Sequence, residues 1–143
     1  MIYIGIDTGV HTGFAMIAGP ERIAETLPIH SALDRVKELS NGVDPIHVRV
    51  EDARLRKWFG RNSNAKSQGA GSIKRDAKIW NDFLTELAAD TLGLVTFQMV
   101  HPIKGATKMN SEIFKQITGI ETRTSEHARD AFMLIHNFKI QAQ

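Results

Sequence analysis

The sequence predicts an α/β domain built around a mixed β-sheet, and three observations support this prediction. Residues 2–7 and 46–51 alternate apolar and polar side chains with the period of two that is typical of strands. Residues 30–39 between them have a partly apolar helical face. A strand–helix–strand connection favours parallel pairing with a right-handed crossover. With 143 residues, we expect a single domain that spans residues 1–143.

The composition is that of a soluble globular protein, with 42% hydrophobic and 24% charged residues. The sequence lacks an apolar run long enough for a transmembrane helix, and it opens directly into a strand instead of a secretory signal. The absence of cysteine excludes disulfides and thiolate metal sites. We therefore expect a cytoplasmic protein that does not associate with membranes.

The first half of the chain begins with a strand that ends at Asp7, a glycine turn at Gly9 and Gly13, and a second strand through Ile17. The next expected elements are a strand over Glu21–Thr26, a helix over His30–Leu39 with a capping-box-like start at Ser31 and Asp34, and a strand over Ile46–Asp52.

The second half begins with a basic loop over Arg54–Gln68, which lacks a clear period. It is followed by a long helix over Ile73–Ala89, a strand over Leu94–Val100, a second basic loop over Ile103–Lys108, a short helix from Asn110 or Ser111 through Ile117, and a last helix from Thr124 or Ser125 to about Ile140.

Two carboxylates stand at the ends of apolar strands. Asp7 ends the first strand, and Glu51 ends the strand after the first helix. If these strands pair in parallel, their ends lie about 5 Å apart and the two carboxylates converge. The alternative for Asp7 is a purely local role in an Asx turn. Asp52 is a second candidate beside Glu51, but strand alternation places it on the opposite face.

The last helix adds His127 and Asp130, which are three residues apart and therefore share a helical face. Helix-dipole stabilisation is an alternative explanation for Glu126 in the first turn, and it explains Asp130 poorly. The alternative for His127 is a partly buried imidazole with a structural hydrogen bond. Together, Asp7, Glu51, His127 and Asp130 are the donors expected to bind Mg²⁺ or Mn²⁺, with two ions per site cleaving a phosphodiester.

The basic side chains gather in one segment. Residues 54–78 contain eight Lys or Arg against one acid, a balance of 8 − 1 = +7, and the remaining 118 residues carry 10 − 15 = −5. Such a block suits a polyanion, although a solvated loop and helix face would have the same composition. The residues expected to contact DNA are Arg54, Arg56, Lys57, Arg61, Lys66, Lys74, Arg75, Lys104 and Lys108.

These motifs resemble those of a known family. Residues 4–15, Ile-Gly-Ile-Asp-Thr-Gly-Val-His-Thr-Gly-Phe-Ala, resemble the opening strand motif of the RuvC-type Holliday-junction resolvases, in the RNase H-like (retroviral integrase) superfamily. Glu51 matches the second acid of that family, and His127-Ala128-Arg129-Asp130 resembles its last-helix motif. The resemblance covers nearly the whole chain in the right order, and the length is closer to that of the phage-encoded members.

The resemblance implies an RNase H-like fold with a five-stranded mixed sheet in the order 3-2-1-4-5, flanked by helices. It also implies a homodimer that resolves four-way junctions by paired nicks with Mg²⁺, in the host cytoplasm for a phage protein. Lys108 would contact a phosphate, in the ground state or the transition state. The family's aromatic wedge is displaced here, with Arg54 near its position and Trp58 or Phe59 as substitutes, and the Gly-rich lysine loop is abbreviated.

Three other functions are compatible with parts of the pattern. The chain could be a related nuclease acting on RNA or other branched DNA, or a non-catalytic junction-binding protein, although intact acids argue against the latter. An actin-like phosphotransferase also uses Asp-Thr-Gly in a hairpin, but that fold needs a duplicated domain that one 143-residue unit does not easily supply.

Overall fold

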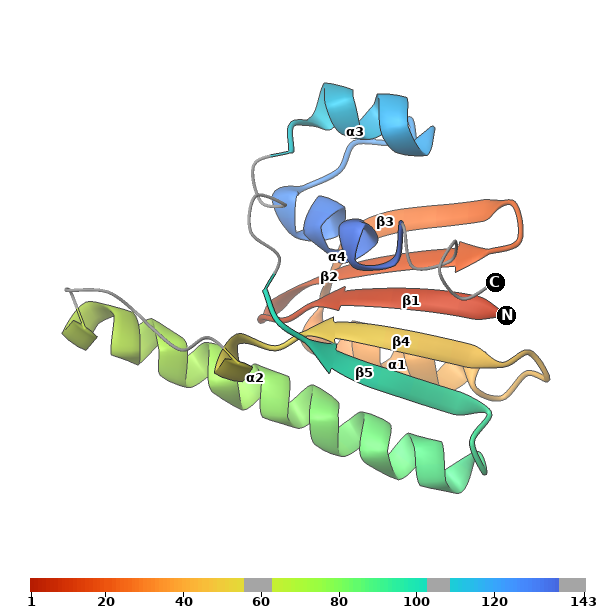
Figure 1. The fold of residues 1–143 in the computed structure, drawn as a ribbon, viewed down its shortest axis with the longest axis horizontal. Helices are drawn as coiled ribbons and strands as arrows, with labels where there is room; N and C mark the ends of the chain where they lie inside the picture. The colour runs from red at the N-terminus through yellow and green to blue at the C-terminus, as the bar shows by residue number, and fades with distance from the viewer. Residues whose placement is uncertain (56–62, 103–108, 137–143) are drawn as a thin grey trace.

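A computed structural model describes residues 1–55, 63–102 and 109–136. Five strands form one sheet in the order β3-β2-β1-β4-β5, which confirms the predicted order (Figure 1). The strands are β1 (Ile2–Asp7), β2 (His11–Ala18), β3 (Glu21–Pro28), β4 (Ile46–Glu51) and β5 (Val95–Val100). The first three are antiparallel neighbours, whereas β4 runs parallel to both β1 and β5.

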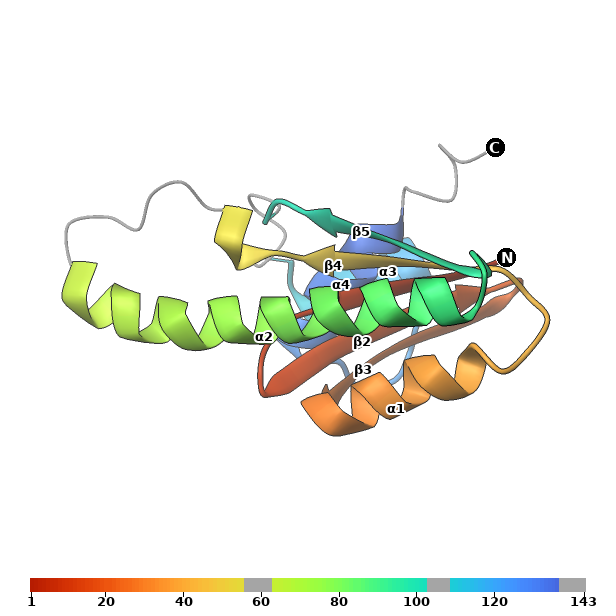
Figure 2. The same cartoon turned by 90° about the horizontal axis from the view of Figure 1, so that it is seen from below.

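The helices divide between the two faces of the sheet. They are α1 (Ile29–Leu39), η1 (Ala53–Leu55, a 3₁₀ turn), α2 (Ser63–Asp90), α3 (Ser111–Thr118) and α4 (Glu126–His136). Figure 2 shows α1 and α2 on one side of the sheet and α4 on the other. In the part of the chain that is described, no helix has the length and apolar character needed to cross a membrane.

Strand alternation produces two hydrophobic clusters, one on each face. Ile4, Ile6, Val48 and Val50 face α1 and α2, where they pack with the fully buried Trp80. On the opposite face, Tyr3 and Ala15 pack with α4 through side chains that include Phe132 and Ile135. The residues that alternate with these core positions in β1 and β4, among them Asp7 and Glu51, therefore lie on the α4 side of the sheet.

Two details differ from the sequence-based expectations. Helix α2 begins at Ser63, ten residues before the predicted start, so part of the expected basic loop is helical. Its first turns extend beyond the sheet (Figure 1), and the sequence there lacks the apolar period on which the predicted start relied. Helix α1 begins directly after Pro28 without a side-chain cap, so the expected capping box is not formed.

Candidate functional site

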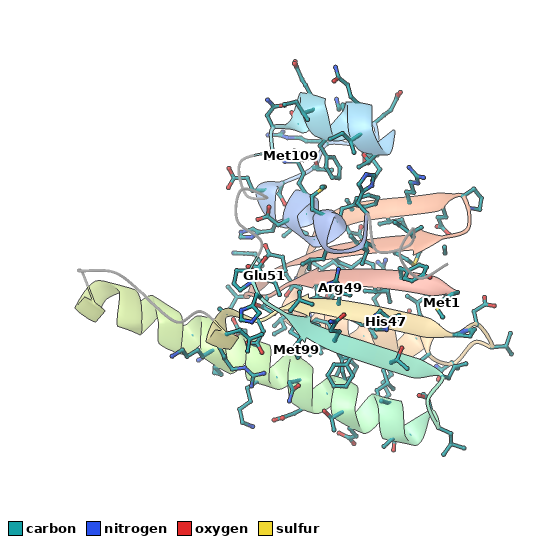
Figure 3. The ribbon with its side chains drawn as sticks, in the orientation of Figure 1. Met1, His47, Arg49, Glu51, Met99 and Met109 are labelled. Carbon is teal, nitrogen blue, oxygen red and sulfur yellow. The ribbon has the colours of Figure 1, made fainter. Side chains whose placement is uncertain are left out.

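The site is centred on the carboxyl ends of β1 and β4. Asp7 is the parallel partner of Glu51 in the register of these neighbouring strands, as predicted. Ile6 and Val50 turn into the core, so Asp7 and Glu51 point to the opposite, α4-covered face. The Thr8 hydroxyl donates to the Glu51 carbonyl at 3.3 Å, which ties the two strand ends together. Figure 3 shows Glu51 at this end of the sheet, beyond His47 and Arg49 on β4.

Two glycines allow α4 to lie directly on the backbone of the β1–β2 hairpin. A Cβ atom added to Gly13 would lie 2.0 Å from the carbonyl oxygen of His127, and one added to Gly5 would lie 2.0 Å from that of Ala131. Gly13 is the antiparallel partner of Asp7 and lies within β2. Its role is therefore close helix packing and not the hairpin turn expected from the sequence.

This close packing brings His127 to Asp7. The imidazole Nδ1 lies 3.0 Å from the Asp7 carboxylate Oδ2, across 120 residues of sequence. The His127 side chain is 53% exposed, whereas that of Asp7 is 12% exposed. Burial raises the pKa of Asp7 above its ordinary value, and the hydrogen bond and charge of His127 partly oppose that rise. The pair therefore consists of a largely buried carboxylate and a solvent-exposed imidazole.

Asp130 lies one helical turn further along α4 and is only 7% exposed. Its Oδ1 atom is buried and has no hydrogen-bond partner within the described residues. Burial first, and the charge of Asp7 second, raise the pKa of Asp130 to about 6, against a partial lowering by His127. The influence of Asp7 on Asp130 indicates that the two carboxyl groups share one electrostatic environment.

The start of α4 is anchored by hydrogen bonds to β3 and to residues that precede the helix. The Ser125 hydroxyl is hydrogen-bonded to the Thr26 hydroxyl of β3, and it accepts the Ala128 amide at 3.1 Å. Arg129 donates to the carbonyl oxygens of Thr124 at 2.6 Å and of Met109 at 3.0 Å. These bonds fix the helical turn that carries His127.

The Asp52 side chain differs from that of Glu51 in the face of the sheet toward which it points and in its surroundings. It is 2% exposed, and Arg54 makes an ion pair with it at 2.7 Å. Burial raises the pKa of Asp52, but the hydrogen bonds and charge of Arg54 outweigh burial and hold that pKa below its ordinary value. Arg54, which was expected to contact DNA, is thus already paired.

The other basic residues fall into two groups. Lys74 and Arg75 lie exposed on α2, and Arg75 Nε is 3.7 Å from Asp76. Lys66 lies within α2, as its backbone shows. The predicted contacts Arg56, Lys57, Arg61, Lys104 and Lys108, together with the candidate wedge residues Trp58 and Phe59, lie outside the described residues.

The donors fit a hard divalent cation in their chemistry, because carboxylate oxygens and one imidazole are ligands of Mg²⁺ or Mn²⁺. A buried carboxylate oxygen of Asp130 without a partner, beside a second buried acid, also fits such an ion. Across residues 1–55, 63–102 and 109–136, however, no three His, Asp or Glu side chains already form a metal-binding group. In this conformation Asp7 is bonded to His127, so a ligand shell would require side-chain rearrangement.

The residues that bring the candidate ligands together were not expected from the sequence. Gly5 and Gly13 set how closely α4 approaches but have no side chain to single them out, and the Thr8 hydroxyl ties the strand ends together through a single hydrogen bond to a backbone carbonyl. The available signal was a glycine inside each of two strands, because such a glycine often marks the close approach of another backbone. In the comparisons with known proteins, no protein-family model and no curated protein matches this chain.

Proposed function

We propose that this protein is a Mg²⁺-dependent DNA endonuclease that cuts four-way junctions or related branched DNA, as a RuvC-like resolvase would. The main support is the parallel register that sets Asp7 beside Glu51, with α4 bringing His127 to Asp7 at the same end of the sheet. Ligand sites of open α/β sheets lie at the carboxyl ends of their strands. A local role in turns does not explain why acids from separate elements meet at such an edge.

The proposed site divides the chemistry between cation binding and proton control. Asp7, Glu51, Asp130 and His127 would hold Mg²⁺, as two ions per site, with Mn²⁺ as a substitute. When bound, the ions supply an activated water and charge neutralisation at the leaving 3′-oxygen. Asp130 must lose its proton to act as a ligand, and its raised pKa of about 6 opposes that ionisation at acidic pH. His127 orients the Asp7 carboxylate by its hydrogen bond, and its own side chain is open to solvent.

Substrate binding would rely on the basic face of α2. Lys74 and Arg75 are exposed on this helix, which extends beyond the same end of the sheet as the acids (Figure 1). Lysine and arginine side chains that neutralise phosphates supply affinity without sequence selectivity. A homodimer would present two such sites to the paired strands of a junction. Lys108 remains a predicted phosphate contact.

The decisive experiment is nicking of a synthetic four-way junction with Mg²⁺, by wild type, Asp7→Asn and Asp130→Asn. Both variants should lose cleavage and keep junction binding, because the basic residues are unchanged. Asp44→Asn is the matched control, since Asp44 is an exposed acid before the opposite end of β4. Equal cleavage by wild type and Asp7→Asn would refute the assignment.

Two further substrates separate the alternatives in the same assay. A linear duplex and an RNA–DNA hybrid, each at the same concentration, test whether branching is what the protein selects. Preferential cleavage of the hybrid would identify a different RNase H-like nuclease. Tight junction binding with no cleavage by wild type in either Mg²⁺ or Mn²⁺ would identify a non-catalytic binding protein.

A further inference from the structure

Asp52, the residue after Glu51, accepts hydrogen bonds at both of its carboxylate oxygens. The backbone amide of Arg54 donates to Asp52 Oδ1 at 2.9 Å. Arg54 Nε donates to Oδ1 at 2.9 Å and to Oδ2 at 3.1 Å, and Nη2 donates to Oδ2 at 2.7 Å. Both carboxylate oxygens of Asp52 are therefore satisfied by one residue, in the forked geometry for which arginine is suited and lysine is not.

The backbone around this pair connects it to the rest of the site. The Asp52 amide donates to the Val100 carbonyl at 2.8 Å, which continues the pairing of β4 with β5 past Glu51. The Leu55 amide donates to the Asp52 carbonyl at 3.1 Å and closes the η1 turn, which packs against α2. The chain therefore changes direction at one fixed place, immediately after Glu51.

Glu51 is consequently held from two sides. Its carbonyl accepts the Thr8 hydroxyl from the β1 side, and the next residue is fixed by Arg54 and by Val100. A carboxylate at the last position of a strand would otherwise be subject to fraying of the strand end. An anchor one residue further on moves that fraying away from Glu51.

The same pair keeps an additional negative charge out of the site. Asp52 is adjacent in sequence to a candidate ligand but faces the other side of the sheet, where it is 2% exposed. The guanidinium of Arg54 matches its charge, and the Arg54 side chain is itself only 32% exposed. A guanidinium already bonded to a buried carboxylate has fewer donors to offer to a phosphate.

We infer that Asp52 and Arg54 form a positioning pair that fixes the end of β4 and so holds Glu51 in place, and that Arg54 serves this pair instead of contacting DNA. This inference rests on the proposed function for its catalytic consequence. It assigns roles to two residues that the sequence alone left as a possible ligand and a possible DNA contact.

A double-mutant cycle tests the pair without relying on catalysis. Asp52→Asn, Arg54→Gln and the double variant are compared with wild type by urea unfolding and by the NMR signal of the Glu51 amide. The single variants should each shift the Glu51 amide signal, and the double variant should be no less stable than the worse single variant. Additive losses of stability, or an unshifted Glu51 signal, would overturn the positioning role.

Arg54→Lys distinguishes the pair from a DNA contact, because it keeps the charge and loses the fork. We expect single-turnover junction cleavage to fall at least about tenfold in Arg54→Lys, with the junction Kd within about twofold of wild type. Arg35→Gln is the control, since it breaks the half-buried Arg35–Glu25 pair, 3.0 Å long and formed between β3 and α1 away from the site. Normal cleavage by Arg54→Lys, with weaker binding by Arg54→Gln, would overturn the inference in favour of a DNA contact. If wild type cleaves no substrate, the proposed function fails, and the cycle and the Glu51 signal still decide whether the pair positions Glu51.

Discussion

Substitution of Gly13 by alanine should separate His127 from Asp7 and inactivate the site. The added Cβ would lie 2.0 Å from the His127 carbonyl oxygen, 2.5 Å from its carbonyl carbon and 3.0 Å from Asp7 Cβ. Ordinary contact of a Cβ atom begins near 3.4 Å, so the helix and the hairpin must part by about 1.4 Å. Both obstructing atoms of His127 belong to the backbone, so a change of rotamer cannot relieve the clash.

The displacement is large in comparison with the contact that it affects. The His127–Asp7 distance of 3.0 Å would rise to about 4.4 Å if the helix withdrew along that direction, which is too long for a hydrogen bond. Anchors at Ser125 and Arg129 resist such a movement, so part of the clash remains as strain. Overpacking of this kind costs about 1–3 kcal/mol of unfolding free energy.

Urea unfolding and junction cleavage together measure this effect. Gly13→Ala should lose about 1–3 kcal/mol of stability and cleave poorly even at temperatures where it is fully folded. Gly71→Ala is the matched control, because Gly71 is exposed in α2 with no atom within 4 Å of an added Cβ. It should gain about 0.5–1 kcal/mol through helix propensity and cleave normally. A Gly13→Ala protein with wild-type stability and cleavage would refute the close-packing argument.

Three further predictions address charge and capping. Because the pKa of Asp130 is raised from 3.8 to about 6, the folded state binds its proton more tightly and stability should fall as pH rises through that window. Asp130→Asn should flatten that part of a thermal-unfolding profile, and an unchanged slope would contradict the shift. In salt titrations of junction binding, Lys74→Ala and Arg75→Ala should each reduce the slope of log Kd against log salt concentration by about one. Lys37→Ala on α1 is the control and should leave that slope unchanged. Asn110 caps α3 by accepting a backbone amide at 2.9 Å, so Asn110→Ala should cost about 1 kcal/mol in urea unfolding, and a loss below a few tenths would contradict that role.

The strands of the sheet were predictable from the sequence because strand alternation is a local signal, whereas their order in the sheet was implied by the resemblance. The repeated isoleucine and valine positions in 2–7 and 46–51 were expected to share a buried face, and they do. The parallel register of Asp7 with Glu51 followed from the helix between the two strands. These predictions required only the period of the side chains and the handedness of the connection.

The contact between His127 and Asp7 was not predictable in the same way. It depends on how closely α4 approaches the hairpin, and that distance is set by Gly13 and Gly5, which have no side chain. The pairing of Arg54 with Asp52 was also missed, since a basic residue in a basic segment was interpreted as a DNA contact. In both cases the decisive interaction involves the exact course of the backbone, which periodicity does not report.

Two buried acids near the site allow an internal comparison. Asp52 and Asp130 are 2% and 7% exposed, so both lose hydration on folding. Asp52 is fully satisfied by Arg54 and has a lowered pKa, as expected for an acid with a structural role. Asp130 lies near a second acid, has a buried oxygen without a partner among the described residues, and has a raised pKa. An acid that only stabilised the fold would have been matched as Asp52 is. The unmatched carboxylate is typical of a group kept for function at a cost in stability, and under the proposed function its partner would be a divalent cation.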